Sequence, residues 1–145
     1  MSALQFDVDL EWRADQQFGE ITAGEAHACV SEPRVLGGNG TGMSPEDLFV
    51  AATASSYCIT LAEMLRAVGL PQSSLSIHAE GLVASDTVAE RFTTVIVRPT
   101  IQGADVARRD AYAKAAIAAR NNCFIGRSIR GNIAYVVGEL CLAGR

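Results

Sequence analysis

The chain has 145 residues, of which 49% are aliphatic, aromatic or cysteine, and these proportions are typical of one globular domain over residues 1–145 rather than of a disordered chain. Its net charge of -4 comes without any run of basic residues, so nucleic acid is not an expected partner. Because the first residues hold no basic segment followed by a continuous apolar run, we expect no secretory signal, no membrane partner and a cytoplasmic location.

The N-terminal part of the chain has the pattern of strands. Residues 4–13 alternate between apolar and polar side chains, which predicts a half-buried strand. After a turn near residues 15–19, a weaker alternation over residues 26–30 predicts a second strand that pairs with the first as a hairpin. The glycine-rich residues 33–42 are expected to form a loop.

A helix is predicted from Pro45 to about residue 68. Ser44 suits the N-cap, Pro45 the first helical position, and Gly69 the C-terminal stop. No charged residue occurs between Leu48 and Ala62. A helix that is apolar on every side is typically buried, so we expect this one to be the central helix of the fold.

The second half of the chain predicts two strands, a helix and a final strand. Residues 75–80 and 92–98 have strand patterns around a turn near Ser85 and Asp86, and residues 105–121 favour a helix. A short irregular piece over 123–130 then leads into a strand over 132–142. The order β-β-α-β-β-α-β predicts an α+β fold, with an antiparallel sheet packed on two long helices.

Three common kinds of site are not supported by the sequence. The two histidines, His27 and His78, have no neighbours in sequence to complete four zinc ligands, so no metal is expected. The glycines of residues 37–42 lack the Gly-Lys-Ser/Thr ending of a P-loop, so no nucleotide cofactor is expected. No Ser-His-Asp arrangement of a hydrolase can be proposed.

The four cysteines are scattered, and in a reducing compartment such a distribution does not indicate a structural disulfide framework. A single cysteine in an apolar helix, such as Cys58, is more often core packing than a reactive group. Cys123 is more suggestive, because it stands where a helix ends and where Arg127 and Arg130 follow, and cations favour a thiolate. Cys29 and Cys141 are expected to be packing residues.

Two segments together resemble the OsmC/Ohr family of peroxide-detoxifying proteins. They are PRVLGGNGTGMSPEDLFVAATASSYCITL, which contains Cys58, and NNCFIGRSIRGNIAYVV, which contains Cys123. The two cysteines lie 65 residues apart, as in that family, and the predicted element order fits along nearly the whole chain. Arg34 matches the arginine of an OsmC-like branch, whereas the Ohr branch has its arginine further upstream, where Phe18 stands here.

The resemblance implies a thiol-dependent peroxidase that reduces organic hydroperoxides. Cys58 would attack the peroxide, Cys123 would resolve the sulfenic acid, and an external thiol of the lipoyl-type dithiol class would reduce the disulfide, without a bound cofactor. Arg34, held by Glu46, would favour the Cys58 thiolate.

The spacing on the central helix adds a condition. Glu46 and Cys58 are 12 residues apart, which is roughly 18 Å along a helix, too far for one hydrogen-bonded cluster. We therefore expect Arg34 and Glu46 to come from a partner subunit, in agreement with the intertwined homodimers of the family.

An apolar lining would favour organic hydroperoxides over hydrogen peroxide, because the alkyl part is then buried. Each candidate lining residue is by itself more typical of ordinary core; they are Phe49, Leu61, Met64, Phe124, Ile125 and Ile129. The alternative to an enzyme is a non-catalytic dimeric protein of the same fold that senses redox state or binds a small ligand.

Overall fold

The structure, a computed structural model, describes residues 3–84 and 90–144. The chain forms two compact units, Met1–Phe49 and Val50–Arg145, and each is described by itself. One domain over residues 1–145 stays a prediction, and the turn expected at Ser85 and Asp86 lies outside the described residues.

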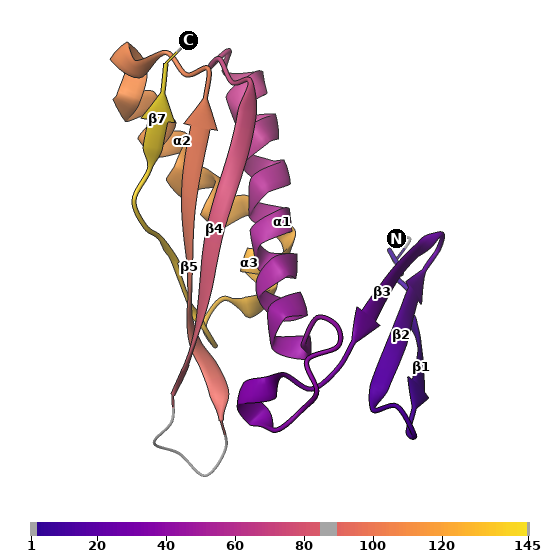
Figure 1. Cartoon of the computed structure of the whole chain (residues 1–145). Coiled ribbons are helices and arrows are strands. Elements are labelled where there is room, and N and C mark those ends of the chain that lie inside the picture. Colours follow the sequence, from indigo (N-terminus) through magenta and orange to yellow (C-terminus); the bar gives the residue numbers. More distant parts are fainter. Residues whose placement is uncertain (1–2, 85–89, 145) are drawn as a thin grey trace. The chain divides into compact units, whose positions relative to one another are not determined.

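The first unit contains a three-stranded antiparallel meander (Figure 1). Its strands are β1 (Asp9–Arg13), β2 (Phe18–Ala23) and β3 (Ala26–Val30). The sequence prediction missed β2, and the second predicted strand pairs with β2 rather than with the first. The prediction of a strand from residue 4 was also wrong, because Asp9 already pairs with Thr22 and β2 ends one residue later, which makes it too short to extend the ladder.

The first strand is exposed rather than half-buried. Every residue of β1 is exposed, and Leu10 and Trp12 keep 57% and 47% of their surface. A single sheet buries an apolar face only against a second layer, and the meander of this unit is one layer. The expected burial was therefore wrong for the single chain, although the alternation itself is present.

The glycine-rich segment folds back along β3. It contains a short 3-10 helix, η1 (Arg34–Leu36), and returns so that the backbone of Met43 bonds to both Cys29 and Ser31. A Cβ at Gly42 would lie 2.3 Å from the carbonyl oxygen of Cys29. This close approach of two backbones requires a glycine at position 42.

Helix α1 (Pro45–Ala67) starts at the predicted cap. The hydroxyl of Ser44 accepts a hydrogen bond from the Asp47 N–H (3.0 Å), and the Asp47 carboxylate accepts one from the Ser44 N–H (3.2 Å). These reciprocal bonds form a capping box, which satisfies backbone donors that a helix start otherwise leaves free.

The other end of α1 closes at Gly69, as predicted. Gly69 has a φ of 71°, a left-handed conformation that costs glycine little. The Leu70 N–H then donates to the Leu65 carbonyl (2.9 Å) and the Gly69 N–H to the Arg66 carbonyl (3.2 Å), the two bonds of a Schellman motif.

Helix α1 buries one face rather than all of its surface. The buried residues recur at every fourth position, and they are Thr53, Tyr57, Leu61 and Leu65. On another side of the helix, Ile59 keeps 62% of its surface. The expectation of a helix buried all round was wrong for the single chain, because the second unit packs against one helical face only.

The second unit holds a mixed sheet rather than the purely antiparallel sheet that was expected. β4 (Ser74–Ala84) and β5 (Arg91–Gln102) pair antiparallel, as predicted, whereas β6 (Ala134–Val137) and β7 (Cys141–Ala143) both pair parallel with β5. The chain between β5 and β6 crosses back through helices, and such a crossover makes the next strand parallel. These helices are η2 (Val106–Arg108), α2 (Arg109–Asn122) and α3 (Phe124–Ile129).

The single last strand predicted over 132–142 is two short strands. Val97 pairs with Val137 and Thr100 with Cys141, so the outer strands hold one residue more than the matching part of β5. Pro99 lies in this interval, and proline has no N–H to donate to a ladder. The backbone therefore leaves the ladder between β6 and β7.

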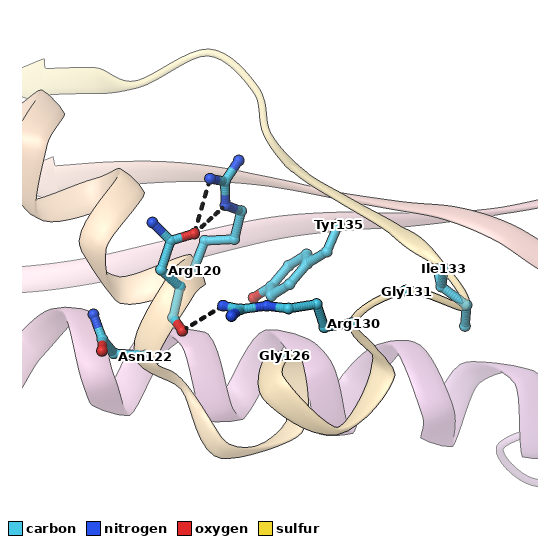
Figure 2. A pocket seen from close by; sticks show the side chains of 8 residues that line it. Arg120, Asn122, Gly126, Arg130, Gly131, Ile133 and Tyr135 are labelled. Carbon is cyan, nitrogen blue, oxygen red and sulfur yellow. Dashed lines mark hydrogen bonds between the residues drawn. The ribbon is translucent and has the colours of Figure 1, made fainter.

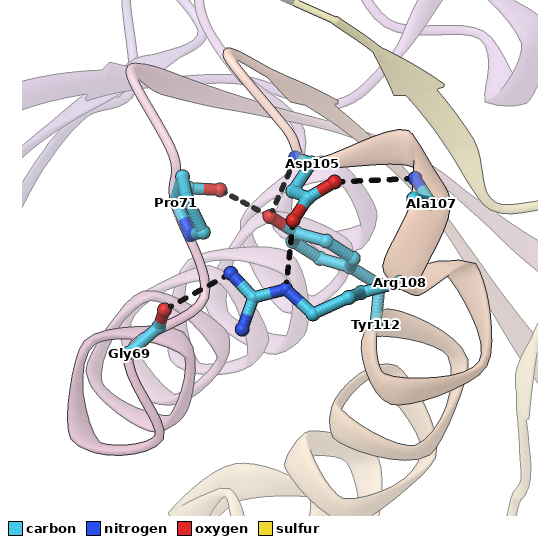
Figure 3. Close-up of polar contacts among 6 residues, drawn as sticks. All are labelled: Gly69, Pro71, Asp105, Ala107, Arg108 and Tyr112. Carbon is cyan, nitrogen blue, oxygen red and sulfur yellow. Dashed lines mark hydrogen bonds and ion pairs between the residues drawn. The ribbon is translucent and has the colours of Figure 1, made fainter.

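The core of the second unit lies between α1, α2 and the sheet. Its buried members are apolar or small apart from two tyrosine hydroxyls, and they are Tyr57, Leu61, Leu65, Leu70, Val97, Ile101, Ala104, Tyr112 and Ala119. At one end of this core, the Tyr112 hydroxyl donates to the Pro71 carbonyl (2.6 Å) and accepts from the Asp105 N–H (3.1 Å) (Figure 3). This hydroxyl links the loop after α1 to the start of the α2 region.

Replacing Tyr112→Phe should lower the free energy of unfolding by about 1–3 kcal/mol, because two backbone groups in a part-buried place lose their hydrogen-bond partner. Chemical denaturation measures this change. Ser55→Ala is the matched control, since it removes an exposed hydroxyl bonded to a helix carbonyl and should change stability by less than about 0.5 kcal/mol. Equal losses in both variants would contradict the role assigned to Tyr112.

Candidate functional site

Cys58 lies in the middle of α1 and is partly buried. Burial raises the pKa of its thiol above the ordinary value of cysteine, because the thiolate is less well solvated than in water. Within the described part of the second unit, the thiolate form that a nucleophilic cysteine needs is therefore not stabilised. A reactive Cys58 requires a cation from elsewhere.

Cys123 lies at the junction of α2 and α3 and is completely buried. Its N–H donates to the Ala119 carbonyl and closes α2, while its carbonyl accepts from the Arg127 N–H and opens α3. The prediction of an irregular piece over 123–130 was therefore wrong, because Phe124–Ile129 form a short helix. The extended backbone of Cys123 (φ -71°, ψ 145°) separates the two helices and keeps the thiol inside the fold.

The Cys123 thiol contacts a tyrosine from the sheet. Its Sγ lies 3.6 Å from the hydroxyl oxygen of Tyr135 and 3.8 Å from the carbonyl oxygen of Arg120. Gly126 closes the same space, because a Cβ there would lie 2.7 Å from this sulfur. The pKa of the Tyr135 hydroxyl is raised, first by burial and then by its hydrogen bond to Cys123. This tyrosine therefore stays protonated at neutral pH.

The segments that carry the two cysteines are in direct contact. The Ser56 hydroxyl, two residues before Cys58, accepts a hydrogen bond from the N–H of Ile125, two residues after Cys123 (3.3 Å). The rings of Tyr57 and Tyr135 meet edge to face, with centroids 6.4 Å apart. The structure thus brings the middle of α1 against the α2–α3 junction.

Tyr57 links α1 to α2 in the core. Its hydroxyl donates to the Ala116 carbonyl (2.9 Å), and its pKa is raised by burial above all and further by the charges of Cys123 and Cys58. Neither Tyr57 nor Tyr135 was predicted as a site residue from the sequence. The only signal for Tyr57 is its place beside Cys58, and Tyr135, 12 residues after Cys123, has none.

Arg34 and Glu46 both belong to the first unit. Arg34 is exposed on η1, and its side chain runs along Gly40, where a Cβ would lie 2.9 Å from its Cγ. Glu46 is in the first turn of α1, and its Oε2 is buried without a hydrogen-bond partner among residues 3–84 and 90–144. Neither residue forms an ion pair within that described part of the chain. That Arg34 and Glu46 stabilise the Cys58 thiolate stays a prediction.

The other predicted residues have varied positions. All four cysteines are free thiols, and Cys29 and Cys141 are exposed, so the expectation that they are packing residues was wrong for the single chain. Both lie in strands whose partners leave their side chains uncovered. Of the expected pocket lining, Leu61 and Met64 belong to or pack against the core, whereas Phe124 is exposed.

Among the described residues, α1 is the one helix whose length and apolar composition would also suit a membrane span. A core helix of a soluble protein passes the same test, and four residues of α1 are buried in the second unit. In the same described part of the chain, no group of three or more His, Cys, Asp or Glu side chains is placed to hold a metal ion.

Comparisons with known proteins agree with this architecture. Residues 38–137 match the family model for OsmC-like protein. The chain is 29% identical to the uncharacterised protein YmaD of Bacillus subtilis, over 92% of this chain and 91% of that protein. This chain therefore belongs to the OsmC-like protein family, as the two cysteine segments predicted.

Solved structures share the fold at low identity. An OsmC-like protein of unknown function from Vibrio cholerae superposes with a TM-score of 0.81 at 18% identity, covering 95% of this chain and 99% of that one. An organic hydroperoxide resistance protein OsmC from Legionella pneumophila gives a TM-score of 0.71 at 20% identity, over 97% and 99% of the two chains. These matches confirm the α+β fold class and its OsmC-like form.

Gly126→Ala should destabilise the second unit by about 1–3 kcal/mol, because the added methyl group meets the Cys123 sulfur and the Tyr135 ring at contact distances below 3 Å. This loss should exceed the gain of about 1 kcal/mol that alanine brings to a helix over glycine. Denaturant unfolding measures the balance. Ser128→Ala, on the exposed side of the same helix, is the control and should be neutral. A stabilised Gly126→Ala protein would show that the space beside Cys123 is open.

Proposed function

We propose that this protein is a soluble, cytoplasmic thiol peroxidase that reduces organic hydroperoxides through Cys58 and Cys123. The observation that carries the proposal is the contact between the two cysteine segments, made by the Ser56–Ile125 hydrogen bond and by the Tyr57–Tyr135 ring contact. Membership of the OsmC-like family supports it. So does the similarity in fold to a protein named for organic hydroperoxide resistance.

The proposed chemistry has three steps. The Cys58 thiolate attacks the terminal peroxide oxygen, the O–O bond breaks, and the alkoxide leaves with a proton as an alcohol, which leaves Cys58 as a sulfenic acid. The Cys123 thiol attacks that sulfur, water leaves, and a Cys58–Cys123 disulfide forms. An external dithiol then reduces the disulfide by two exchanges and becomes a disulfide itself, so no bound cofactor is needed.

The first step needs a cation beside Cys58. Burial alone raises the pKa of this thiol, which disfavours the reactive thiolate at neutral pH. Arg34 is the proposed cation and Glu46 the residue that orients it. Among the described residues, no donor bonds to the buried Oε2 of Glu46, so this oxygen can accept a hydrogen bond from a guanidinium group.

A homodimer would supply these groups. Within one helix, 12 residues separate Glu46 from Cys58, or about 18 Å along the axis, so Glu46 cannot reach the thiol of its own chain through α1. A second subunit would also cover apolar side chains that the single chain exposes. They are Leu4, Phe6, Val8, Leu10 and Trp12 in the first unit and Ile59 on α1.

Wild-type protein should consume cumene hydroperoxide in the presence of a dithiol, and Cys58→Ser should abolish this turnover because it removes the nucleophile. Cys123→Ser should react once with peroxide and then accumulate a sulfenic acid or a mixed disulfide. A coupled assay of peroxide loss measures both effects. Cys29→Ser and Cys141→Ser, at exposed cysteines, are matched controls and should keep full turnover.

The same assay separates the enzyme from the alternative. A non-catalytic redox sensor or ligand-binding protein would form a Cys58–Cys123 disulfide without repeated turnover. Wild-type protein that consumes no more than one equivalent of peroxide with several dithiols would therefore overturn the peroxidase proposal.

Arg34→Gln should raise the pH midpoint for alkylation of Cys58, because burial then acts on the pKa of the thiol without an opposing charge. Turnover at pH 7 should fall with the fraction of Cys58 that is thiolate, by up to about tenfold for each unit by which the midpoint rises. The pH dependence of iodoacetamide labelling, read by peptide mass spectrometry, measures the midpoint.

Arg13→Gln is the matched control for this experiment. Arg13 is an exposed arginine of the same unit, and its ion pair is with Glu20. The Arg13→Gln substitution changes the net charge by the same amount as Arg34→Gln and should leave the pH midpoint for Cys58 alkylation unchanged. Identical midpoints in wild type and Arg34→Gln would exclude Arg34 as the activating group.

A further inference from the structure

An open pocket of about 530 Å³ lies among the end of α2, α3 and the start of β6 (Figure 2). Arg120 and Arg130 are two of the residues that line it, together with Asn121, Ile133 and Tyr135. A pocket of this size lies within the range of small-molecule sites. The peroxidase chemistry proposed above makes no use of its two arginines.

Asn121 orients both guanidinium groups. Its side-chain oxygen accepts hydrogen bonds from Nε (3.1 Å) and Nη2 (2.9 Å) of Arg120, and its backbone carbonyl accepts one from Nη2 of Arg130 (2.9 Å). Figure 2 shows Arg120 and Arg130 extending from separate segments of the chain. Because all of these acceptors belong to one neutral residue, they fix the arginines without cancelling either charge.

Within the described part of the chain, the pocket therefore has two positive charges and no acidic lining residue. No Asp or Glu is among its lining residues, and neither Arg120 nor Arg130 forms an ion pair among residues 3–84 and 90–144. Each guanidinium keeps donors beyond those that Asn121 engages, in the planar fork that matches a carboxylate. Such a pocket selects an anion over a neutral molecule.

Two other lining residues indicate that the anion has an apolar part. Ile133 supplies apolar surface, and Tyr135 presents an aromatic ring whose hydroxyl is already engaged with Cys123. An inorganic ion would leave this surface without a partner, whereas an organic acid would cover it. We infer that this pocket is a binding site for a small organic carboxylate, held by Arg120 and Arg130 with its apolar part against Ile133 and Tyr135.

The site borders the redox centre but does not depend on it. Gly126 and Tyr135 line the pocket and also enclose the Cys123 sulfur, so the ligand lies on the other side of that wall. Binding needs neither thiol. A Cys58→Ser protein should bind the ligand as wild type does, and the site and the peroxidase proposal can therefore fail separately.

Benzoate and benzamide test the inference, because they share size and ring but differ in charge. In an NMR titration at pH 7, wild-type protein should bind benzoate saturably, with shifts at Ile133 and Tyr135, and should bind benzamide at least about tenfold more weakly. Arg120→Gln and Arg130→Gln should each weaken benzoate binding about tenfold, since each removes a charged hydrogen-bond donor.

Arg127→Gln is the control for general charge. Arg127 is exposed on α3, between the two pocket arginines in sequence, and does not line the pocket. Its loss should leave benzoate affinity within about twofold, because an exposed charge that does not line the pocket is screened by solvent. Equal binding of benzamide, an equal effect of Arg127→Gln, or inorganic phosphate that binds as tightly as benzoate would each overturn the assignment.

Discussion

The buried tyrosine at position 57 is the constraint on which the core of the second unit depends. A fully buried hydroxyl must find a partner, and Tyr57 finds it in the Ala116 carbonyl of α2, so α1 and α2 meet at a fixed place. The same side chain contacts the Tyr135 ring. Because Cys58 follows Tyr57 and Cys123 contacts Tyr135, the core packing also determines where the two thiols lie.

Local signals in the sequence predicted the local parts of the fold, but they did not predict which distant strands pair with one another. The cap at Ser44 and the stop at Gly69 depend on a few neighbouring residues, and both are present. The parallel pairing of β6 with β5 depends on the crossover through α2 and α3, which no window of sequence reports. The gap before β7 follows from Pro99 in the strand beside it, far away in sequence.

Burial was predicted less well than secondary structure, and the errors share a cause. Alternation identifies which side chains of β1 are apolar, but it cannot tell whether the same chain or another covers them. The cysteines show the converse: Cys123, expected in an irregular piece, is buried, while Cys29 and Cys141, expected to be packing residues, are exposed. The pairing of Cys58 with Cys123 came from resemblance to a family, since a cysteine in an apolar helix is by itself more typical of core packing, and Tyr135 could be found only in the structure.

The central claim is that Cys58 and Cys123 form one redox pair, and peptide mass spectrometry after one equivalent of an organic hydroperoxide tests it most directly. The account predicts a protein lighter by two hydrogen atoms, with a single cross-link between the peptides of Cys58 and Cys123. A sulfenic acid that persists on Cys58 in wild-type protein, or a cross-link through the exposed Cys29 or Cys141, would contradict it.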